Sequence, residues 1–496
     1  AKAIAAAQDD DTVMLVADTT EDITISGKKL TLDLGGKTLT NTGIGKATLF
    51  VGSNAVVSVQ NGSIVGGASY YNIQCGTEAD PTGSIELTDV TATAGNDGSS
   101  MIDNWGILTI HSGTYTGGMN TVKSEPTGTL TINGGDFTCS YAASYSYNGV
   151  VLSYGTATVT DGTFTHTATT PNWAYPCAFM TAKDKDTDPT PHTTITGGTF
   201  TVKHSRGKSI WGYGKANSSN FEISGGHYSP APSTSAVAEG YGVTDKVDGY
   251  YGIAPANAIT IEPLTNGKIT TTSPAPEGKK VTLRITATTG YVLDTISVKT
   301  ASGTEVAVTG SVTSKTFTMP AEAVTVSATF KKADYKITIK ATNGTVTAPA
   351  TAQYGETVSL AVTPDPGYEL STISVKKSTT KVTLNEDSTF TMPAGAVTVT
   401  ATFKAIPYGI AVAEGITNGM VTVEAQPATV GTTVPVTVSP AEGYALKELY
   451  YTTEGSDEHH AIEAVDDGYT LNMPAEAVTI HAAFQKLTYT VTVADG

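Results

Sequence analysis

The sequence predicts an all-β chain in two parts: a right-handed parallel β-helix of about eight to nine turns, followed by three tandem small β domains. Two periodicities carry this prediction. Up to residue 236 a short motif recurs at steps of 22–36 residues. From residue 258 a different set of anchors recurs, with Asn-Gly and Gly-Tyr at steps of 75–77 residues. Neither part shows the 3.6-residue apolar period of an amphipathic helix, so both are expected to consist of strands.

The first motif has two apolar residues two positions apart and a third one five positions further on. It runs LDLGGKTL (32–39), VSVQNGSI (57–64), IELTDVTA (85–92), LTIHSGTY (108–115), LTINGGDF (130–137), ATVTDGTF (157–164), TTITGGTF (193–200) and FEISGGHY (221–228). The pair predicts a short strand with one inward face, and the following Gly or Asp-Gly predicts a turn. The last apolar residue begins a second strand that points into the same core.

A third strand fits between successive motifs. The candidates are TLFV (48–51), YNIQ (71–74), MIDN (101–104), NTVKSE (120–125), VVLS (150–153), AFMT (178–181) and SIWGY (209–213). A turn of three short strands cannot bury its apolar face alone, so it stacks on its neighbours. The expected inward ladders begin at Leu34, Leu39 and Phe50 in the first turns. Residues 1–8, rich in Ala, predict a short helix that covers the open end of the coil.

Over residues 1–236 this Thr- and Gly-rich repeat resembles the pectate-lyase-like β-helix superfamily, in particular the β-helices of bacterial surface proteins. The resemblance implies the fold but not an activity. Because many β-helix enzymes are polysaccharide lyases or hydrolases, it also requires a search for an active site.

The second part repeats three anchors. They are Asn-Gly at 266, 343 and 418, Gly-Tyr at 290, 367 and 443, and Met-Pro-Ala at 319, 392 and 473. They predict modules at 258–332, 335–405 and 408–486, preceded by a closing hairpin and linker at 237–257 and followed by the first strand of a fourth module at 487–496. The modules resemble the divergent B-repeats that form stalks in internalin-like Gram-positive surface proteins. That resemblance implies a β-grasp-like fold, whereas the absence of a helical segment makes a small sandwich an equal alternative.

Composition excludes several classes of partner. The net charge is −17 and the pI is about 4.8, and Arg206 and Arg284 are the only arginines among 29 basic residues. A phosphate backbone or an anionic membrane needs a basic face, so no nucleic acid is expected as a partner. No apolar run of ~18 residues is present, so no membrane insertion is expected. Cys75, Cys139 and Cys177 have no metal-ligand spacing and are expected to be free thiols.

The outward positions of the third strands supply the candidate catalytic residues. If Ile102 and Val122 point inward, Asp103, Lys123 and Glu125 point outward on adjacent turns and cluster. Two carboxylates roughly 5–9 Å apart are what a glycosidase uses. The alternative is a solvent-exposed Asp-Lys ion pair, worth under ~1 kcal/mol. Because the paired aspartates of polygalacturonase-like hydrolases and the mid-stack arginine of lyases are absent, we expect no enzyme.

One acidic loop copies part of a calcium-binding pattern. Asp184, Asp186 and Asp188 match the first three ligand positions of such a loop, but Pro189 replaces the required Gly and Ile195 replaces the bidentate Glu. We therefore expect a solvated loop and no cofactor, with calcium as the alternative.

Aromatic residues in the same third strands supply the candidate binding surface. Trp105, Tyr154, Trp211 and Tyr213, with Gln74, are predicted to point outward in rows, and the chain's tryptophans, at 105, 173 and 211, all fall on this side. Exposed rings offer a large contact area to sugar rings or a peptide at low entropic cost. The alternative is that these rings merely cover the β-helix.

These observations favour a non-enzymatic adhesin of a Gram-positive bacterium, extracellular at the cell surface or in the cell wall, and monomeric. Its β-helix head would bind a glycan or a host or surface protein, and the modules would be a stalk. One alternative is a carbohydrate-active enzyme that uses Asp103, Lys123 and Glu125. The other is a purely structural cell-wall protein.

Overall fold

A computed structural model describes residues 1–492 apart from 44, 69, 142–146, 170–174, 425 and 467. The prediction of an all-β chain is confirmed: the described residues form many strands, one short α-helix, α1 (Lys2–Ala6), and 3-10 turns at Ser218–Asn220 and Thr234–Ala236. No helix in these ranges is long and apolar enough to cross a membrane. The chain divides into two compact units, 1–264 with 269–286 and 295–328, and 265–268 with 287–294 and 329–496.

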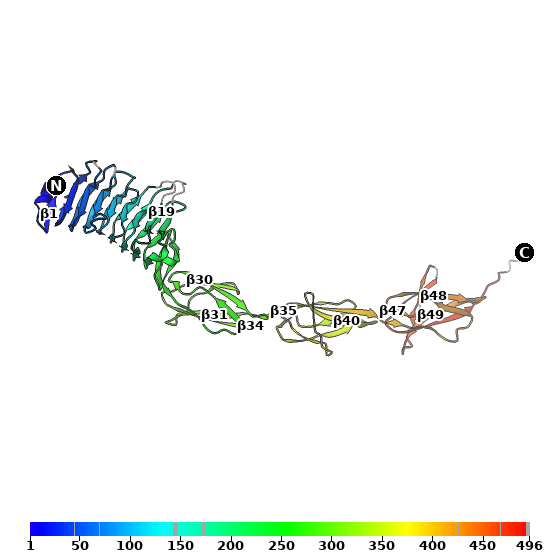
Figure 1. Cartoon of the computed structure of the whole chain (residues 1–496). Coiled ribbons are helices and arrows are strands. Elements are labelled where there is room, and N and C mark those ends of the chain that lie inside the picture. Colours follow the sequence, from blue (N-terminus) through cyan, green and yellow to red (C-terminus); the bar gives the residue numbers. More distant parts are fainter. Residues whose placement is uncertain are drawn as a thin grey trace. The chain divides into compact units, whose positions relative to one another are not determined.

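Residues 11–229 form three rows of parallel strands, which we call the stack (Figure 1). Each of the first eight passes of the chain adds one strand to each row, and the ninth adds one to rows one and two only. Row one comprises β1 (Asp11–Met14), β4 (Lys29–Asp33), the start of β7 (Val56–Val65) and of β9 (Ser84–Thr93), β11 (Ile107–Ile110), β14 (Thr129–Ile132), β17 (Thr156–Val159), β20 (His192–Ile195) and β23 (Phe221–Ile223). Row two comprises β2 (Thr19–Thr20), β5 (Thr38–Thr40), the ends of β7 and β9, β12 (Gly113–Thr116), β15 (Asp136–Cys139), β18 (Thr163–His166), β21 (Thr199–Val202) and β24 (His227–Ser229).

Row three is a separate eight-stranded sheet, and it carries the candidate site. Its strands are β3 (Ile23–Ser26), β6 (Leu49–Gly52), β8 (Ile73–Cys75), β10 (Ile102–Asn104), β13 (Val122–Ser124), β16 (Tyr147–Ser153), β19 (Tyr175–Lys183) and β22 (Lys208–Gly214). Because parallel neighbours align equivalent positions, the same face of every strand points to one side of this sheet.

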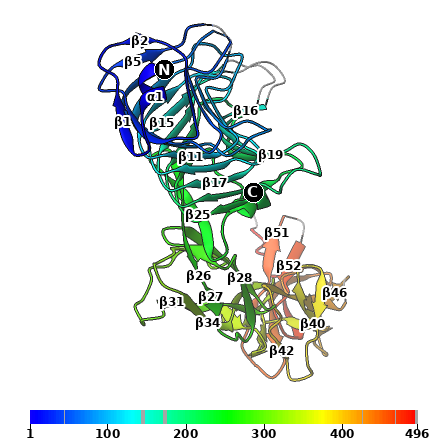
Figure 2. The ribbon, with the colours of Figure 1, turned by 60° about the vertical axis from the view of Figure 1, so that its left-hand side comes forward.

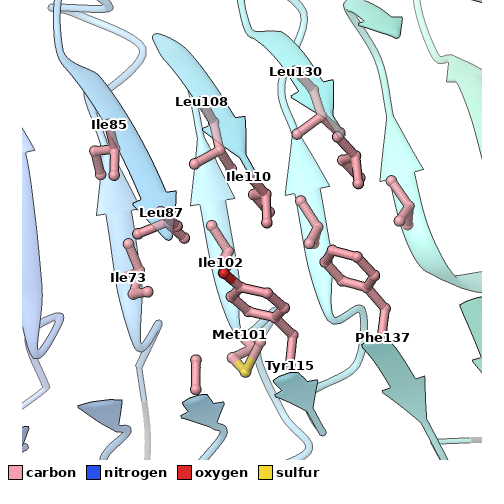
Figure 3. Packing of buried hydrophobic residues seen from close by; sticks show 14 of the residues in the cluster. Ile73, Ile85, Leu87, Met101, Ile102, Leu108, Ile110, Tyr115, Leu130 and Phe137 are labelled. Atoms are coloured by element: carbon pink, nitrogen blue, oxygen red, sulfur yellow. The ribbon is translucent and has the colours of Figure 1, made fainter. Parts of the chain in front are cut away.

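The core lies between the rows, where aliphatic and aromatic side chains alternate with outward polar ones. Figure 3 shows Ile73 and Ile102 of row three facing Leu87, Ile110 and Tyr115 of the other rows. All five side chains are fully buried. Helix α1 adds Ile4 to the same cluster, as expected of a cap over the first turn.

Two register predictions at the start of the stack are wrong. Leu32, not Leu34, pairs with Val59, because the turn after Asp33 is two residues longer than in later passes. Leu34 is still buried, and it packs so closely on the next pass that a Cβ at Gly62 would lie 2.4 Å from the Leu34 Cβ. In β6, Leu49 and Val51 point inward and Phe50 outward, because Leu49 rather than Phe50 pairs with Ile73.

A hairpin of β25 (Tyr241–Val247) and β26 (Tyr250–Asn257) follows the stack (Figure 2). β26 pairs antiparallel with β24 and therefore ends the parallel ladder. This change of direction covers the open edge of the last strand in row two.

The strands of residues 259–332 follow the repeat anchors. They are β27 (Ile259–Ile261), β28 (Gly267–Thr270), β29 (Ala275–Pro276), β30 (Lys280–Ala287), β31 (Tyr291–Thr300), β32 (Thr309–Gly310), β33 (Ser314–Thr318) and β34 (Val324–Lys332). β27 pairs in parallel with β34, and β30 pairs antiparallel with β33.

The second module repeats this arrangement around its own core. Its strands are β35 (Asp334–Lys340), β36 (Gly344–Thr347), β37 (Thr351–Gln353), β38 (Thr357–Ser359), β39 (Ala361–Pro364), β40 (Tyr368–Lys377), β41 (Thr380–Val382), β42 (Thr389–Thr391) and β43 (Val397–Ala405). The first strand, β35, pairs in parallel with the last, β43, which also pairs antiparallel with β40.

The third module has two four-stranded sheets and a two-stranded one formed by its first and fourth strands. Its strands are β44 (Pro407–Tyr408), β45 (Ile410–Val412), β46 (Gly419–Val423), β47 (Ala428–Thr429), β48 (Thr433–Pro440), β49 (Tyr444–Thr453), β50 (His460–Ala461), β51 (Glu463–Val465), β52 (Gly468–Asn472) and β53 (Val478–Lys486). The described residues of the modules contain sheets and no helix, which agrees with the sandwich alternative rather than the β-grasp one. The strand predicted at 487–496 is absent from residues 487–492, and residues 493–496 lie outside the described ranges.

Candidate functional site

The outward face of row three brings the predicted site residues together in two lines. The first line pairs Gln74 with Asp103, Asp103 with Lys123 and, further along, Met180 with Trp211. Leu152 stands between Lys123 and Met180. Gln74, Asp103, Lys123 and Trp211 therefore share the outward face, as the sequence predicts. At the first position Phe50, predicted to point inward, pairs with Gln74 and belongs to this line.

The second line lies two residues further along each strand. It contains Trp105, Glu125, Tyr154, Ala182 and Tyr213. The Glu125 amide donates to the Asn104 carbonyl and the Tyr154 amide to the Ser124 carbonyl, both with the spacing of a parallel ladder, 2.8 and 2.7 Å. Because side chains alternate along a strand, both lines share one face.

Asp103, Lys123 and Glu125 form a compact charged cluster in the middle of this face. The Lys123 ammonium makes an ion pair with Glu125. Trp105 donates its indole N–H to Asp103 Oδ2 at 3.1 Å, whereas Asp103 Oδ1 has no hydrogen-bond partner among the described residues. The exposed fractions of Asp103 and Glu125 are only 1% and 7%, so the prediction of a solvent-exposed ion pair is wrong.

Burial changes the acidity of this cluster. Loss of water around Asp103 and the negative charge of Glu125 together raise the pKa of Asp103 to about 7, although Lys123 and the Trp105 hydrogen bond act in the opposite direction. Tyr71 lies close enough that burial and the charges of both carboxylates raise its pKa to about 12. The Lys123 ammonium also lies 5.6 Å from the centroid of the Tyr154 ring, within the range of a cation–π contact.

The aromatic residues continue the face toward the end of row three. Leu152, Met180 and Ala182 are buried in a small apolar cluster against which Tyr154, Trp211 and Tyr213 pack. Trp211 and Tyr213 meet edge to face with centroids 6.3 Å apart, and Tyr175 meets Trp211 in the same way at 5.5 Å. The four predicted binding aromatics are half-buried, not exposed as predicted, because the outward face carries this second apolar cluster. They are Trp105, Tyr154, Trp211 and Tyr213. Trp173 lies outside the described residues.

A pocket of about 410 Å³ opens beside this aromatic group. Trp211, Phe221 and Pro232 give it apolar walls, and Lys208, Asn217 and Ser218 add polar ones. The mixture of a tryptophan ring with amide, hydroxyl and ammonium groups is common in sites for small polar ligands.

The three candidate calcium ligands do not converge. Asp186 makes an ion pair with Lys215, and Asp188 Oδ2 accepts the Lys185 backbone amide at 2.9 Å. Asp184 instead lies near Tyr154, where burial and then its charge raise the pKa of that phenol. Among the described residues no group of three or more acidic, His or Cys side chains could hold a metal ion.

Sequence reasoning named the centre of the site but missed part of its surroundings. Tyr71 and Tyr175 precede or begin third strands, and the Arg206 guanidinium stacks 4.6 Å from the Tyr175 ring centroid. Tyr71 and Arg206 come from segments that precede strands and whose paths have no sequence period, whereas Tyr175 is the first residue of β19. Arg206 lies just before β22, three passes after Lys123, and its position in the sequence gave no signal of its contact with Tyr175.

Comparison with known families concerns the second part of the chain. The family model of the divergent InlB B-repeat domain matches residues 257–334, 335–407 and 408–488. The predicted resemblance to B-repeats is therefore confirmed for three tandem repeats, which indicate a repeat-type or surface protein. The match does not extend to residues 1–256, whose resemblance to pectate-lyase-like proteins stays a prediction.

Two further comparisons add little. No curated protein matches the sequence. Among matching solved structures is an I-band fragment of titin, at 9% sequence identity and a TM-score of 0.09, with 48% of this chain and 97% of the fragment covered. A likeness at that TM-score carries no argument about fold or function.

Proposed function

We propose that this chain is a bacterial surface protein of the adhesin type. In this proposal residues 1–236 are a right-handed parallel β-helix head that binds a glycan or a host or surface protein, and the B-repeats are spacers. The repeated passage of the chain through three rows of parallel strands supports the β-helix. The right-handed sense follows from the strong preference for right-handed crossovers between parallel strands.

The observation that carries the binding role is the aromatic face of row three on a chain with tandem B-repeats. Trp211 lines a pocket that also offers hydrogen-bonding groups, and Tyr213 packs against Trp211. Half-buried rings are already held by their neighbours, so they lose little conformational freedom when a ligand stacks on them. This is the arrangement expected of a binding surface for sugar rings or an extended peptide.

Charge narrows the class of ligand. Residues 1–240 contain 12 basic and 21 acidic side chains, which gives a net charge of −9 by subtraction. Long-range repulsion therefore disfavours sulfated and other polyanionic glycans. Neutral glycans and neutral or basic protein surfaces remain the favoured partners.

An array of glycans and host surface proteins tests the proposal. The double variant Trp105→Ala, Trp211→Ala should weaken the binding of any ligand found by ~2 kcal/mol or more, because aromatic anchors dominate such surfaces. Tyr489→Ala is the matched control, since this ring is 76% exposed and lies outside the stack. Equal binding by the wild-type protein and the double variant would show that the ligand binds elsewhere. If the protein binds nothing on the array, the result would favour the alternative of a purely structural cell-wall protein.

The rival enzyme would use Asp103 and Glu125 as its acid–base pair. The raised pKa of Asp103 suits a general acid, but its exposed fraction of 1% leaves the carboxyl group out of reach of a polymer. Incubation with pectin, alginate and glycosaminoglycans should therefore release no new reducing ends. Release that disappears in Glu125→Gln would establish the enzyme and overturn the non-enzymatic proposal.

A further inference from the structure

Lys123 and Asp103 stand directly opposite each other on adjacent parallel strands. They are register partners of β13 and β10, with their side chains on the same outward face. Neighbouring strands lie ~4.8 Å apart. The Lys123 ammonium is paired with Glu125 and lies more than 4 Å from either Asp103 oxygen. A lysine side chain reaches roughly 6 Å from its Cα when extended, so a rotation of the Lys123 side chain, with both strands kept in register, can bring Nζ toward the Asp103 carboxyl carbon.

Glu125 completes a three-residue arrangement. It follows Lys123 by two positions, which places it on the same face, and its carboxylate is in ion-pair contact with the Lys123 ammonium. Its exposed fraction is 7%, so water competes weakly for its oxygens. Glu125 is therefore positioned to take a proton from Lys123 and return it to a leaving group.

The Asp103 carboxyl group has the features of an electrophile that an amine can attack, rather than those of a carboxylate held in an ion pair. Its Oδ1 is buried and accepts no hydrogen bond from a donor among the described residues. Glu125 lies close enough to share a hydrogen bond with the Asp103 carboxyl group once that group is protonated, which favours the neutral acid. The Asp103 pKa of about 7 means that much of this group is uncharged near neutral pH, and an amine attacks the neutral acid far more readily than the carboxylate. The indole N–H of Trp105, 3.1 Å from Oδ2, can stabilise negative charge that develops on that oxygen.

We propose that Lys123 and Asp103 condense into an intramolecular amide that cross-links β10 to β13. Glu125 accepts a proton from the Lys123 ammonium, and the free amine attacks Cγ of the protonated Asp103. The Cγ–Nζ bond forms, the Cγ–OH bond breaks, and the hydroxyl leaves as water with the proton held by Glu125. Glu125, having given its first proton to the leaving hydroxyl, accepts a second proton from nitrogen and passes it to solvent, which gives the neutral amide. No oxidant, reductant or further reactant is needed.

The product would suit this location. Condensation removes one positive and one potentially negative group from a largely buried site and leaves an amide N–H beside Glu125. It also joins two neighbouring passes of the stack covalently, across a sheet otherwise held by hydrogen bonds. The inference does not depend on the proposed binding function. It does conflict with the enzyme alternative, because a condensed Asp103 has no acid left.

Intact mass under denaturing conditions tests the cross-link on the full chain. The wild-type protein should weigh one water molecule less than its sequence, and a branched peptide containing residues 103 and 123 should appear after proteolysis. Lys123→Arg and Glu125→Gln should each restore the full sequence mass. Lys215→Arg is the matched control: its ion pair with Asp186 is exposed, at 48% and 84% of the two side chains, so this variant should keep the loss.

A further variant keeps the test decisive if Lys123→Arg fails to fold. Asp103→Asn should release ammonia in place of water and give the same final mass as the wild-type protein. A wild-type mass equal to that of the sequence would overturn the proposal. A water loss that persists in folded Lys123→Arg would also overturn it, because the bond would then lie elsewhere.

Discussion

Five rings in row two show how register decides side-chain geometry at the scale of single residues. Tyr115, Phe137, Phe164, Phe200 and Tyr228 form a continuous stack with centroids 4.7–5.0 Å apart and nearly parallel planes. This spacing is that of the strands themselves, so the sheet imposes the stacking. The terminal tyrosines also satisfy their hydroxyls, because each donates to a backbone carbonyl three residues before it, at 2.9 and 2.8 Å.

His166 is the exception in its ladder, where Cys139 and Val202 are its register partners. It is fully buried, and its Nε2 lies 3.0 Å from the side-chain amide of Asn148. Burial, with a smaller contribution from the charge of His204, lowers the pKa of His166 to about 4 from an ordinary value of 6.5. The folded protein therefore holds this ring neutral where an unfolded chain would protonate it.

A pH-dependent loss of stability follows from His166. Between pH 6.5 and about pH 4 the unfolded chain protonates His166 and the folded protein does not. Protonation therefore stabilises the unfolded chain, and the free energy of unfolding falls by ~3 kcal/mol as the pH decreases from about 6.5 to about 4. Above pH 6.5 this loss is absent. Urea titrations between pH 4 and 7, followed by tryptophan fluorescence, measure this change in the first part of the chain, because all three tryptophans precede residue 236. His166→Val should flatten the acid side of the profile, and an unaltered slope would contradict the assignment.

At the scale of elements, the second and third modules each have a core made of their own side chains. In the second module Ile337, Val358, Val375, Phe390 and Val399 are among the side chains of a single buried cluster. Every member of that cluster lies between residues 335 and 403. The Asn-Gly anchor has a packing reason as well: a Cβ on Gly344 would lie 2.6 Å from the ring of Phe403, the aromatic residue near the end of the last strand of the module.

Residues 335–405 expressed alone should therefore fold as a monomeric β domain. Stability should be modest, because a chain of about this size buries only ~60% of the surface that it exposes when unfolded. Dispersed amide resonances in a proton–nitrogen correlation spectrum are the expected result. A collapsed, disordered spectrum would mean that neighbouring modules supply necessary contacts.

At the scale of the whole molecule, the proposed function assigns binding to one part and spacing to the other. The aromatic face and its pocket lie in residues 1–236, and the cores of the second and third modules are closed apolar clusters. We therefore expect a ligand to contact residues 1–236 and not the second and third modules. This expectation can be tested whatever the ligand is.

A competition experiment tests this division. A fragment of residues 335–488 in large excess should not displace the full chain from any ligand found on the array, because it lacks the aromatic face. The full chain without label is the positive control and should compete fully. Displacement by the fragment would transfer the binding role to the B-repeats.

Periodicity predicted those features that depend on neighbours along the sequence. The strand rows, the stacked positions from Tyr115 to Tyr228, and the outward line Gln74, Asp103, Lys123 all follow from a two-residue alternation within strands repeated in each pass. After Asp33 the turn is longer than in later passes, and the same alternation wrongly aligned Leu34 with Val59. The apolar motif alone does not show how many residues a turn contains.

Tertiary structure alone decided how much water reaches the site. Composition and spacing placed Asp103, Lys123 and Glu125 together, but not their burial, because that depends on side chains such as Tyr71 and Tyr154 from other passes of the chain. Because the cluster is buried, the pKa of Asp103 is raised and its Oδ1 accepts no hydrogen bond from a described donor, whereas neither would hold for a solvent-exposed ion pair. The sequence by itself therefore determined which residues share a face, since that is a matter of local geometry. Their solvation and chemical state were decided by long-range packing.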